Sequence, residues 1–148
     1  MNNKIGIITY HNAINYGAVL QTYALSSFIA KKTNDIEVID YHCRSIDIQY
    51  SFKNLKNSFS ILNFFAHNIT CIIHWKKKRL FNRFVRDHIR LSKIIYDIDT
   101  LKNSDYKILI SGSDQVFNPM CNRNDKSFFL DFDRNSLKYS YAASIGSI

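Results

Sequence analysis

The fold of this chain is decided by residues 5–41, which read IGIITYHNAINYGAVLQTYALSSFIAKKTNDIEVIDY. The apolar run from Lys4 to Tyr10 predicts a buried strand, and residues 15–32 carry apolar side chains at helical spacing. After a short polar turn, Ile36 to Tyr41 predicts a second strand. A strand, a helix and a strand in this order favour a parallel pair joined by a right-handed crossover.

The rest of the sequence extends this unit into one α/β domain. A chain of 148 residues with 46% hydrophobic and 22% charged residues is typical of a single globular domain. We therefore predict a Rossmann-like fold over residues 1–148, with a mostly parallel sheet flanked by helices. The further elements expected are an irregular connection at 43–57, a helical region at about 58–90, a short helix at 99–103, strands at 107–111 and 137–144, and an ordered loop at 118–135 with an apolar plug at 128–130.

Positive charge is concentrated in the central helical region. The net charge is +8, and residues 51–95 hold ten Lys or Arg against one acid, Asp87. Because the charge belongs to one element, it does not favour a general nucleic-acid binder. Two interpretations stay open: a solvated helix face, or a docking strip for an anionic polysaccharide, a lipid surface or an acidic partner. The strip consists of Arg79, Arg83, Arg86 and Arg90, with Leu80, Phe81, Phe84, Val85 and His88 largely opposite.

The apolar stretch from Ser58 to Trp75 has no charged residue and is followed by four cations at 76–79. This is the arrangement of a membrane segment with a basic flank. The stretch is short of the ~20 residues that span a bilayer, and polar residues interrupt it. A helix that covers the domain or lies at an interface is therefore the favoured interpretation.

The N-terminus, the cysteines and the histidines indicate a cytoplasmic protein without a metal centre. Residues 1–4 lead directly into the first strand, without the pattern of a signal peptide. Cys43, Cys71 and Cys121 are odd in number and widely spaced, which indicates neither a disulfide framework nor a zinc site. The five histidines show no metal-ligand spacing, and only His11 lies in a candidate site. A structural role is favoured for it over that of a base.

Three polar motifs each follow a predicted strand, at residues 11–17, 111–119 and 143–146. Ligands of open α/β sheets bind beyond the carboxyl ends of the strands. If the strands are parallel, all three motifs lie along one edge of the sheet and form one site.

The first motif stands at the entrance of the predicted helix. The start of a helix offers free N–H groups, which suit an anionic or hydroxyl-rich ligand. Asn15, Tyr16 and Gly17 lie at this point, and Gln21 follows one turn later. The alternative is that Asn15 caps the helix and no ligand binds there.

The second motif places small and polar side chains at a predicted strand end. Ser113 and Gln115 can hydrogen-bond sugar hydroxyls, and Asp114 can orient or deprotonate an acceptor hydroxyl. Capping of the following turn is an equally good role for this aspartate. The sequence contains no phosphate-loop, dinucleotide-binding or nucleophile-elbow motif. The candidate ligand-binding residues are His11, Asn15, Tyr16, Gly17, Gln21, Gly112, Ser113, Gln115, Asn118 and Ser144, with Asp114 as the candidate catalytic group.

Taken together, these motifs resemble the polysaccharide pyruvyl transferase family. The matching blocks stand in the family's order and extend over essentially the whole chain. They are residues 5–11 with 15–25, residues 39–41, the basic helix at 77–84, the distinctive block at 111–119, where the family commonly has Trp in place of Phe117, and residues 139–146.

The resemblance implies a glycosyltransferase-B-like architecture of two facing Rossmann-type halves, of which this chain corresponds to the N-terminal one. Members of the family transfer the pyruvyl group of phosphoenolpyruvate to hydroxyls of a cell-envelope or exopolysaccharide sugar, usually as a cyclic ketal. The expected partners are thus a sugar or polysaccharide-precursor acceptor and a second half of the enzyme. Phosphoenolpyruvate is a co-substrate, and neither a cofactor nor a metal is intrinsic to the reaction. Because the family continues into a second domain that supplies much of the donor binding, we expect no transfer by residues 1–148 alone.

Two other classes of function stay open. One is a sugar- or nucleotide-sugar-binding domain of a glycosyltransferase-like protein, which would bind a nucleotide-sugar but not phosphoenolpyruvate. The other is a non-catalytic interaction module that uses the arginine strip at 79–90, which would show salt-sensitive binding to an anionic polymer or lipid.

Overall fold

The computed structural model describes residues 3–43 and 61–146, with the side chains of 61–74 and 103 left out of that description. Five strands, two long helices and several short helical turns follow one another along the chain. In order they are β1 Ile5–Ile8, α1 Tyr16–Ala30, β2 Ile36–Tyr41, α3 Ile61–His88, β3 Leu91–Tyr96, the 3₁₀ helix η2 Thr100–Asn103, β4 Ile108–Asp114, α4 Pro119–Asn122, the 3₁₀ helix η3 Lys126–Phe129 and β5 Leu137–Ala143.

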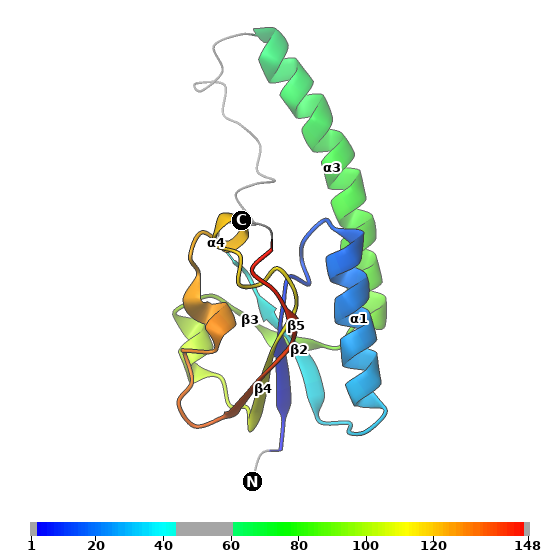
Figure 1. Ribbon diagram of the computed structural model, residues 1–148. Coiled ribbons are helices and arrows are strands. Elements are labelled where there is room, and N and C mark those ends of the chain that lie inside the picture. The colour runs from blue at the N-terminus through cyan, green and yellow to red at the C-terminus, as the bar shows by residue number, and fades with distance from the viewer. Residues whose placement is uncertain (1–2, 44–60, 147–148) are drawn as a thin grey trace.

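The strands form one sheet in the order β3-β2-β1-β4-β5, and every neighbouring pair is parallel. The chain adds β2 and β3 on one side of β1, and then β4 and β5 on the other side (Figure 1). The direction of winding therefore reverses between β1 and β4, which is the switch point of a doubly wound sheet. The predicted α/β Rossmann-like arrangement, with a parallel sheet flanked by helices, is confirmed.

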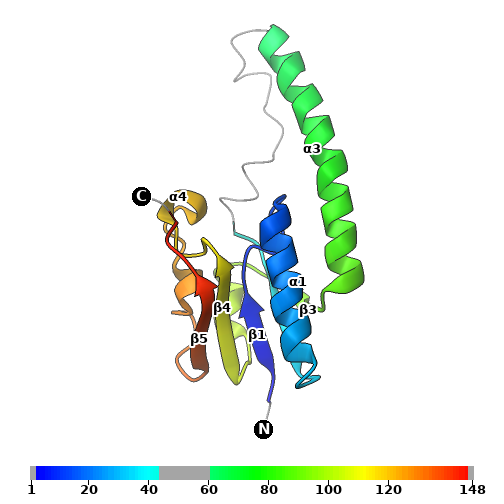
Figure 2. The ribbon, with the colours of Figure 1, turned by 45° about the vertical axis from the view of Figure 1, so that its right-hand side comes forward.

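Each face of the sheet carries its own hydrophobic core. Successive residues of a strand point to opposite faces, so Ile7 and Ile8 belong to different cores. On one face α1 and α3 lie side by side, as both ribbon views show (Figures 1 and 2), and this core includes Val19 and Phe81. On the other face the short turns cover the sheet, with Phe128 of η3 buried against it.

Three sequence predictions need correction. Strand β3 was not predicted, because apolar and polar residues do not alternate along Leu91–Tyr96 and three of its six residues are exposed. Strand β4 was expected to end at Ser111 but continues to Asp114, so the first four residues of the second motif lie within the strand. Arg90, the last residue of the predicted arginine strip, lies beyond the end of α3 and donates to the Asn34 carbonyl at 2.7 Å.

The predicted apolar side of the central helix is only partly buried. Phe81 and Val85 are in the core, whereas Leu80 is 67% exposed and His88 is also exposed. The plug at 128–130 is likewise divided, because Phe129 points to solvent. The spacing of these residues in the sequence fits a helix or a turn, but it does not show which of the side chains lie in the core and which lie at the surface.

Parts of what the sequence predicts for residues 43–75 fall outside the described residues. The expected irregular connection at 43–57 is described only at Cys43, which is buried. Of the apolar stretch 58–75, residues 61–75 form the first half of α3. Among the described residues, no helix is both long and apolar enough to cross a membrane.

Candidate functional site at the carboxyl edge of the sheet

The parallel sheet brings the three polar motifs to one edge. The first motif begins three residues after β1, the second includes the end of β4, and the third begins at the last residue of β5. Since all five strands run in the same direction, these ends lie on the same side of the sheet. In doubly wound folds this is the edge where ligands bind, next to the switch point.

Two hydrogen bonds join β1 and β4 across the switch point. The Thr9 hydroxyl donates to the Ser113 carbonyl at 3.2 Å, and the Tyr10 hydroxyl donates to the Gln115 carbonyl at 3.3 Å. Burial, with smaller contributions from nearby acidic groups, raises the pKa of Tyr10 above its ordinary value. Its hydroxyl therefore stays protonated and acts as a donor. These two hydrogen bonds fix the segments that follow β1 and β4 against each other.

A carboxylate between two imidazoles lies at the ends of β1 and β2. Asp40 Oδ1 is 2.9 Å from Nε2 of the buried His11 and 3.3 Å from Nε2 of His42. Burial favours a higher pKa for Asp40, but the hydrogen bonds from His11 and then His42 outweigh it and hold this pKa below its ordinary value. His11 Nε2 is engaged by a carboxylate, and Nδ1 lies 3.4 Å from the Thr9 carbonyl. Both partners accept hydrogen bonds, which supports the structural role favoured for His11.

Asp40 and His42 were absent from the candidate residues. The signal that would have found them is chemical: Asp40 is an acid in a largely apolar strand, and a histidine follows two residues later. A charged group in a buried strand needs a partner, and His11 at the end of the neighbouring strand supplies one.

The first motif builds the start of α1. Asn15 Oδ1 accepts from the backbone N–H of Gly17 at 2.8 Å and of Ala18 at 3.3 Å, so Asn15 is the N-cap. The Tyr16 ring lies 4.7 Å from the Phe81 ring of α3, and thus turns toward that helix. Gln21 is exposed one turn further along α1. Asn15 therefore caps the helix, as one of the two predictions for this motif expects, and Tyr16 lies away from the second motif.

The second motif combines a constrained backbone with an unpartnered hydroxyl. Gly112 has φ +137°, and a Cβ there would lie 2.0 Å from the Tyr141 carbonyl oxygen, so only glycine fits against β5. The following peptide bond, Gly112–Ser113, is cis. Ser113 is 3% exposed, and its Oγ has no hydrogen-bond partner among the described residues. Half-buried Asp114 uses Oδ1 to accept from the Gln115 N–H at 2.8 Å.

The second and third motifs are bonded to each other. The Ser144 N–H donates to the Asp114 carbonyl at 2.9 Å, and the Ser144 carbonyl accepts from the Phe117 N–H at 3.2 Å. Asn118 caps α4 and donates through Nδ2 to Gln115 Oε1 at 2.9 Å. Gly146 packs directly against this side-chain pair. Gln115, Asn118 and Ser144 therefore hold the edge together.

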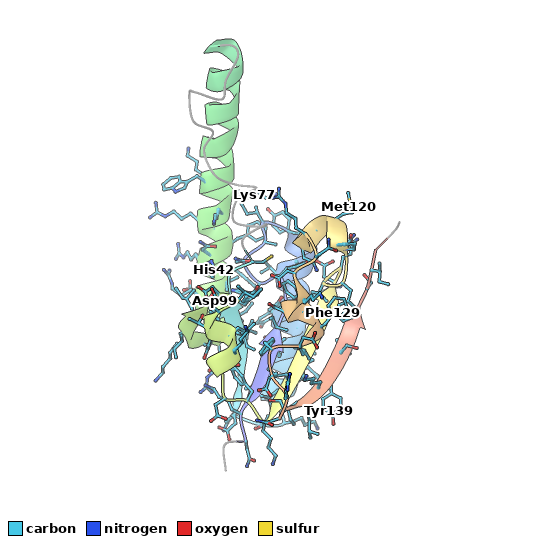
Figure 3. The ribbon with its side chains drawn as sticks, turned by 90° about the vertical axis from the view of Figure 1, so that its left-hand side faces the viewer. His42, Lys77, Asp99, Met120, Phe129 and Tyr139 are labelled. Atoms are coloured by element: carbon cyan, nitrogen blue, oxygen red, sulfur yellow. The ribbon has the colours of Figure 1, made fainter. Side chains whose placement is uncertain are left out.

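An open pocket of about 710 Å³ lies beyond the ends of β2 and β3, on the same edge. Figure 3 shows His42 and Asp99 on the same side of the molecule, and both line this pocket. Tyr41 closes its floor by donating to Asp125 Oδ2 at 2.5 Å. Burial, then the hydrogen bond to Asp125, raises the pKa of Tyr41. The other lining residues are Cys43, Asp97, Ile98, Asn122, Arg123 and Asn124.

The pocket offers hydrogen-bond donors and acceptors of both charges, which suits a polyhydroxylated ligand. The sequence analysis did not predict this pocket, because the residues that line it come from three separate loops. The polar run at 122–125, placed after the only proline, was the one available signal. Within the described residues, no group of three His, Cys, Asp or Glu side chains has metal-binding geometry.

Comparisons of the chain with family models, with curated proteins and with solved structures gave no significant match.

Proposed function

We propose that this chain is the N-terminal, acceptor-binding part of a polysaccharide pyruvyl transferase. The complete enzyme would transfer the pyruvyl group of phosphoenolpyruvate to hydroxyls of a cell-envelope or exopolysaccharide sugar. The proposal rests on the sequence blocks that resemble this family.

The observation that carries the proposal is the meeting of these blocks at one place. Residues 11–17, 111–119 and 143–146 are far apart in the sequence, and the parallel sheet brings them to its carboxyl edge. Two of the blocks are also joined by hydrogen bonds between Asp114, Phe117 and Ser144. Half of an active site requires its distinctive residues to lie together at the edge of the sheet where ligands bind.

Within this proposal, Asp114 and Ser113 act on the acceptor sugar. A carboxylate has acceptor sites beyond the one that Asp114 uses for the Gln115 N–H, so it can take the proton of an acceptor hydroxyl. The Ser113 hydroxyl is buried and has no hydrogen-bond partner in the part of the chain that the structure describes, and a sugar hydroxyl would satisfy it. Asn15, Gln115 and Asn118 then support the site through the hydrogen bonds of their side chains, and Gly112 through its backbone conformation, rather than by contact with substrate.

The proposal includes a cytoplasmic location, on the inner side of the membrane. Phosphoenolpyruvate is an intracellular metabolite, and the acceptor would be a precursor assembled there. The donor anion would be held largely by the second half of the enzyme.

The test is a transfer assay on the protein as isolated from its source, with the second half where the source encodes one. We expect phosphate release from phosphoenolpyruvate that depends on an acceptor sugar. Asp114→Asn should lower the rate about 100-fold or more without loss of folding. Asp131→Asn, which removes an exposed carboxylate elsewhere, is the matched control and should keep full activity.

Two results would overturn the proposal. Binding of a nucleotide-sugar without any use of phosphoenolpyruvate would indicate a glycosyltransferase-like binding domain instead. Unchanged turnover in Asp114→Asn would remove the assigned role of Asp114.

A further inference from the structure

The exposed half of α3 presents a dense cluster of positive charge. Within 75–88 six cations face a single acid, Asp87, which Arg83 and Arg86 share at 3.5 and 3.3 Å. One exposed carboxylate cannot neutralise the cluster, so the face stays strongly positive. We call this set the basic face; it consists of Lys76, Lys77, Lys78, Arg79, Arg83 and Arg86.

Large apolar side chains are exposed among these cations. Trp75 is 54% exposed and Leu80 is 67% exposed, both on α3. Neighbouring α1 adds Tyr16, 65% exposed, and Leu20, 54% exposed. An apolar groove of about 380 Å³ lies between the helices, lined by Tyr16, Val19, Leu20, Lys77, Leu80, Phe81 and Phe84.

The cations and the apolar groups are in direct contact. Lys77 Nζ lies 5.1 Å from the centre of the Tyr16 ring and 5.7 Å from that of Phe81. The Arg79 guanidinium lies 5.9 Å from the centre of the Trp75 ring. The charged ends of Lys77 and Arg79 thus lie over aromatic rings, so the cationic and the apolar groups form one continuous surface.

A merely solvated helix face does not account for these apolar groups, because a solvated face is polar throughout. A soluble polyanion would explain the cations but would leave Leu80 and Leu20 exposed. A surface of anionic lipid accounts for both, since its headgroups attract Lys and Arg while Trp, Tyr and Leu enter the boundary with the acyl chains.

We propose that the basic face and the groove beside it dock the protein on an anionic lipid surface. In both ribbon views α3 lies at the margin of the molecule with α1 against one side of it, and the side chains of Arg83 and Arg86 are 74% and 76% exposed, so the basic face is accessible to a flat partner (Figures 1 and 2). This inference is independent of pyruvyl transfer, because lipid binding is measured without any substrate.

The experiment uses the full chain and vesicles of phosphatidylglycerol and phosphatidylcholine in equal parts. Trp75 is the only tryptophan and lies within the proposed surface, so its fluorescence reports on this site alone. We expect a blue shift of the emission with these vesicles, weakened by added salt, and none with pure phosphatidylcholine.

Two variants separate charge from insertion. Arg79→Gln combined with Arg83→Gln should weaken vesicle binding by about 30-fold, as two cations leave the membrane surface. Leu80→Gln keeps every charge and should reduce the blue shift. Lys93→Gln combined with Lys102→Gln removes two exposed cations elsewhere and should bind like the wild type. Circular dichroism would confirm that all variants fold.

Three results would overturn the inference. The first is no blue shift with anionic vesicles, and the second is equal binding by the double arginine variant and the wild type. The third is binding of a soluble polyanion such as heparin as tightly as the vesicles, unaffected by Leu80→Gln, which would assign the surface to an anionic polymer.

Discussion

Single residues at the carboxyl edge have little conformational or chemical freedom. Gly112 is confined by β5, Asn15 by the start of α1, and Asp40 by two imidazoles. The sequence singled out Asn15 and Gly112, because polar and small residues follow predicted strands there, but it did not single out Asp40. It could not separate ligand contact from structural support, because capping and ligand binding use the same side chains.

Gly112→Ala tests the constraint on the backbone. We expect the free energy of unfolding to fall by roughly 3 kcal/mol, because φ is positive and the new Cβ would meet the Tyr141 carbonyl. Urea unfolding measures the loss. Gly17→Ala is the control, with only the Asn15 oxygen near its Cβ at 3.2 Å, and should change stability by less than about 1 kcal/mol. Equal losses in the two variants would contradict this explanation.

Asp40→Asn tests the carboxylate between the imidazoles. The folded pKa of Asp40 is lowered, so its ionised form stabilises the fold above the unfolded pKa, and this contribution is lost as the pH falls through the folded pKa. At neutral pH we expect a cost of about 2 kcal/mol, because two charge-assisted hydrogen bonds are lost. The difference from the wild type should shrink below about pH 4, where the unfolded carboxyl becomes protonated. Unfolding curves across this range measure it, and a constant difference would argue against the assignment.

At the scale of elements, hydrophobic periodicity predicted those segments whose burial is regular. Helix α1 matched because its buried residues Ala18, Val19, Thr22 and Leu25 recur at helical spacing, and strand β2 matched because it is a short, almost wholly buried segment rich in apolar residues. Strand β3 was missed because half of its residues, Lys93, Ile94 and Ile95, are exposed. The extension of β4 through Gly112 was missed because glycine and serine usually mark the end of a strand.

Asn15 provides a test at the N-terminus of α1. Asn15→Ala should lower stability by about 1 kcal/mol, because the N–H groups of Gly17 and Ala18 lose their acceptor. Asn15→Asp retains a capping oxygen and should restore it. Thermal unfolding measures both variants. An Asn15→Ala variant as stable as the wild type would mean that the cap contributes nothing to the fold.

At the scale of the whole molecule, one sheet joins two cores. The residues of β1, β2 and β4 contribute alternately to the core under α1 and α3 and to the core under the short turns. This architecture followed from the order of strands and helices in the sequence, since a strand-helix-strand unit favours parallel pairing. The position of the pocket formed by residues 97–99 and 122–125 could not be predicted from this order, because the pocket depends on how separate loops meet.

Leu109→Ala tests whether the two cores unfold together. Leu109 is fully buried in the core opposite α1 and α3, and its truncation should cost about 3 kcal/mol. If the sheet couples both faces, the helical signal of α1 and α3 should be lost at a lower urea concentration than in the wild type. Circular dichroism and tyrosine fluorescence should report the same midpoint. A helical signal that kept its wild-type midpoint would show that the faces unfold separately.

The central position of β1 has a consequence for the synthesis of the protein. One neighbour of β1 is β4, and Thr9 and Ser113, which bond across their ends, are 104 residues apart. A ribosome that adds about 5–20 residues per second leaves one edge of β1 unpaired for roughly 5–20 seconds. The strand that lies in the middle of the finished sheet is thus an open edge through most of translation. During this interval a chaperone, or a neighbouring nascent chain, competes with β4 for it.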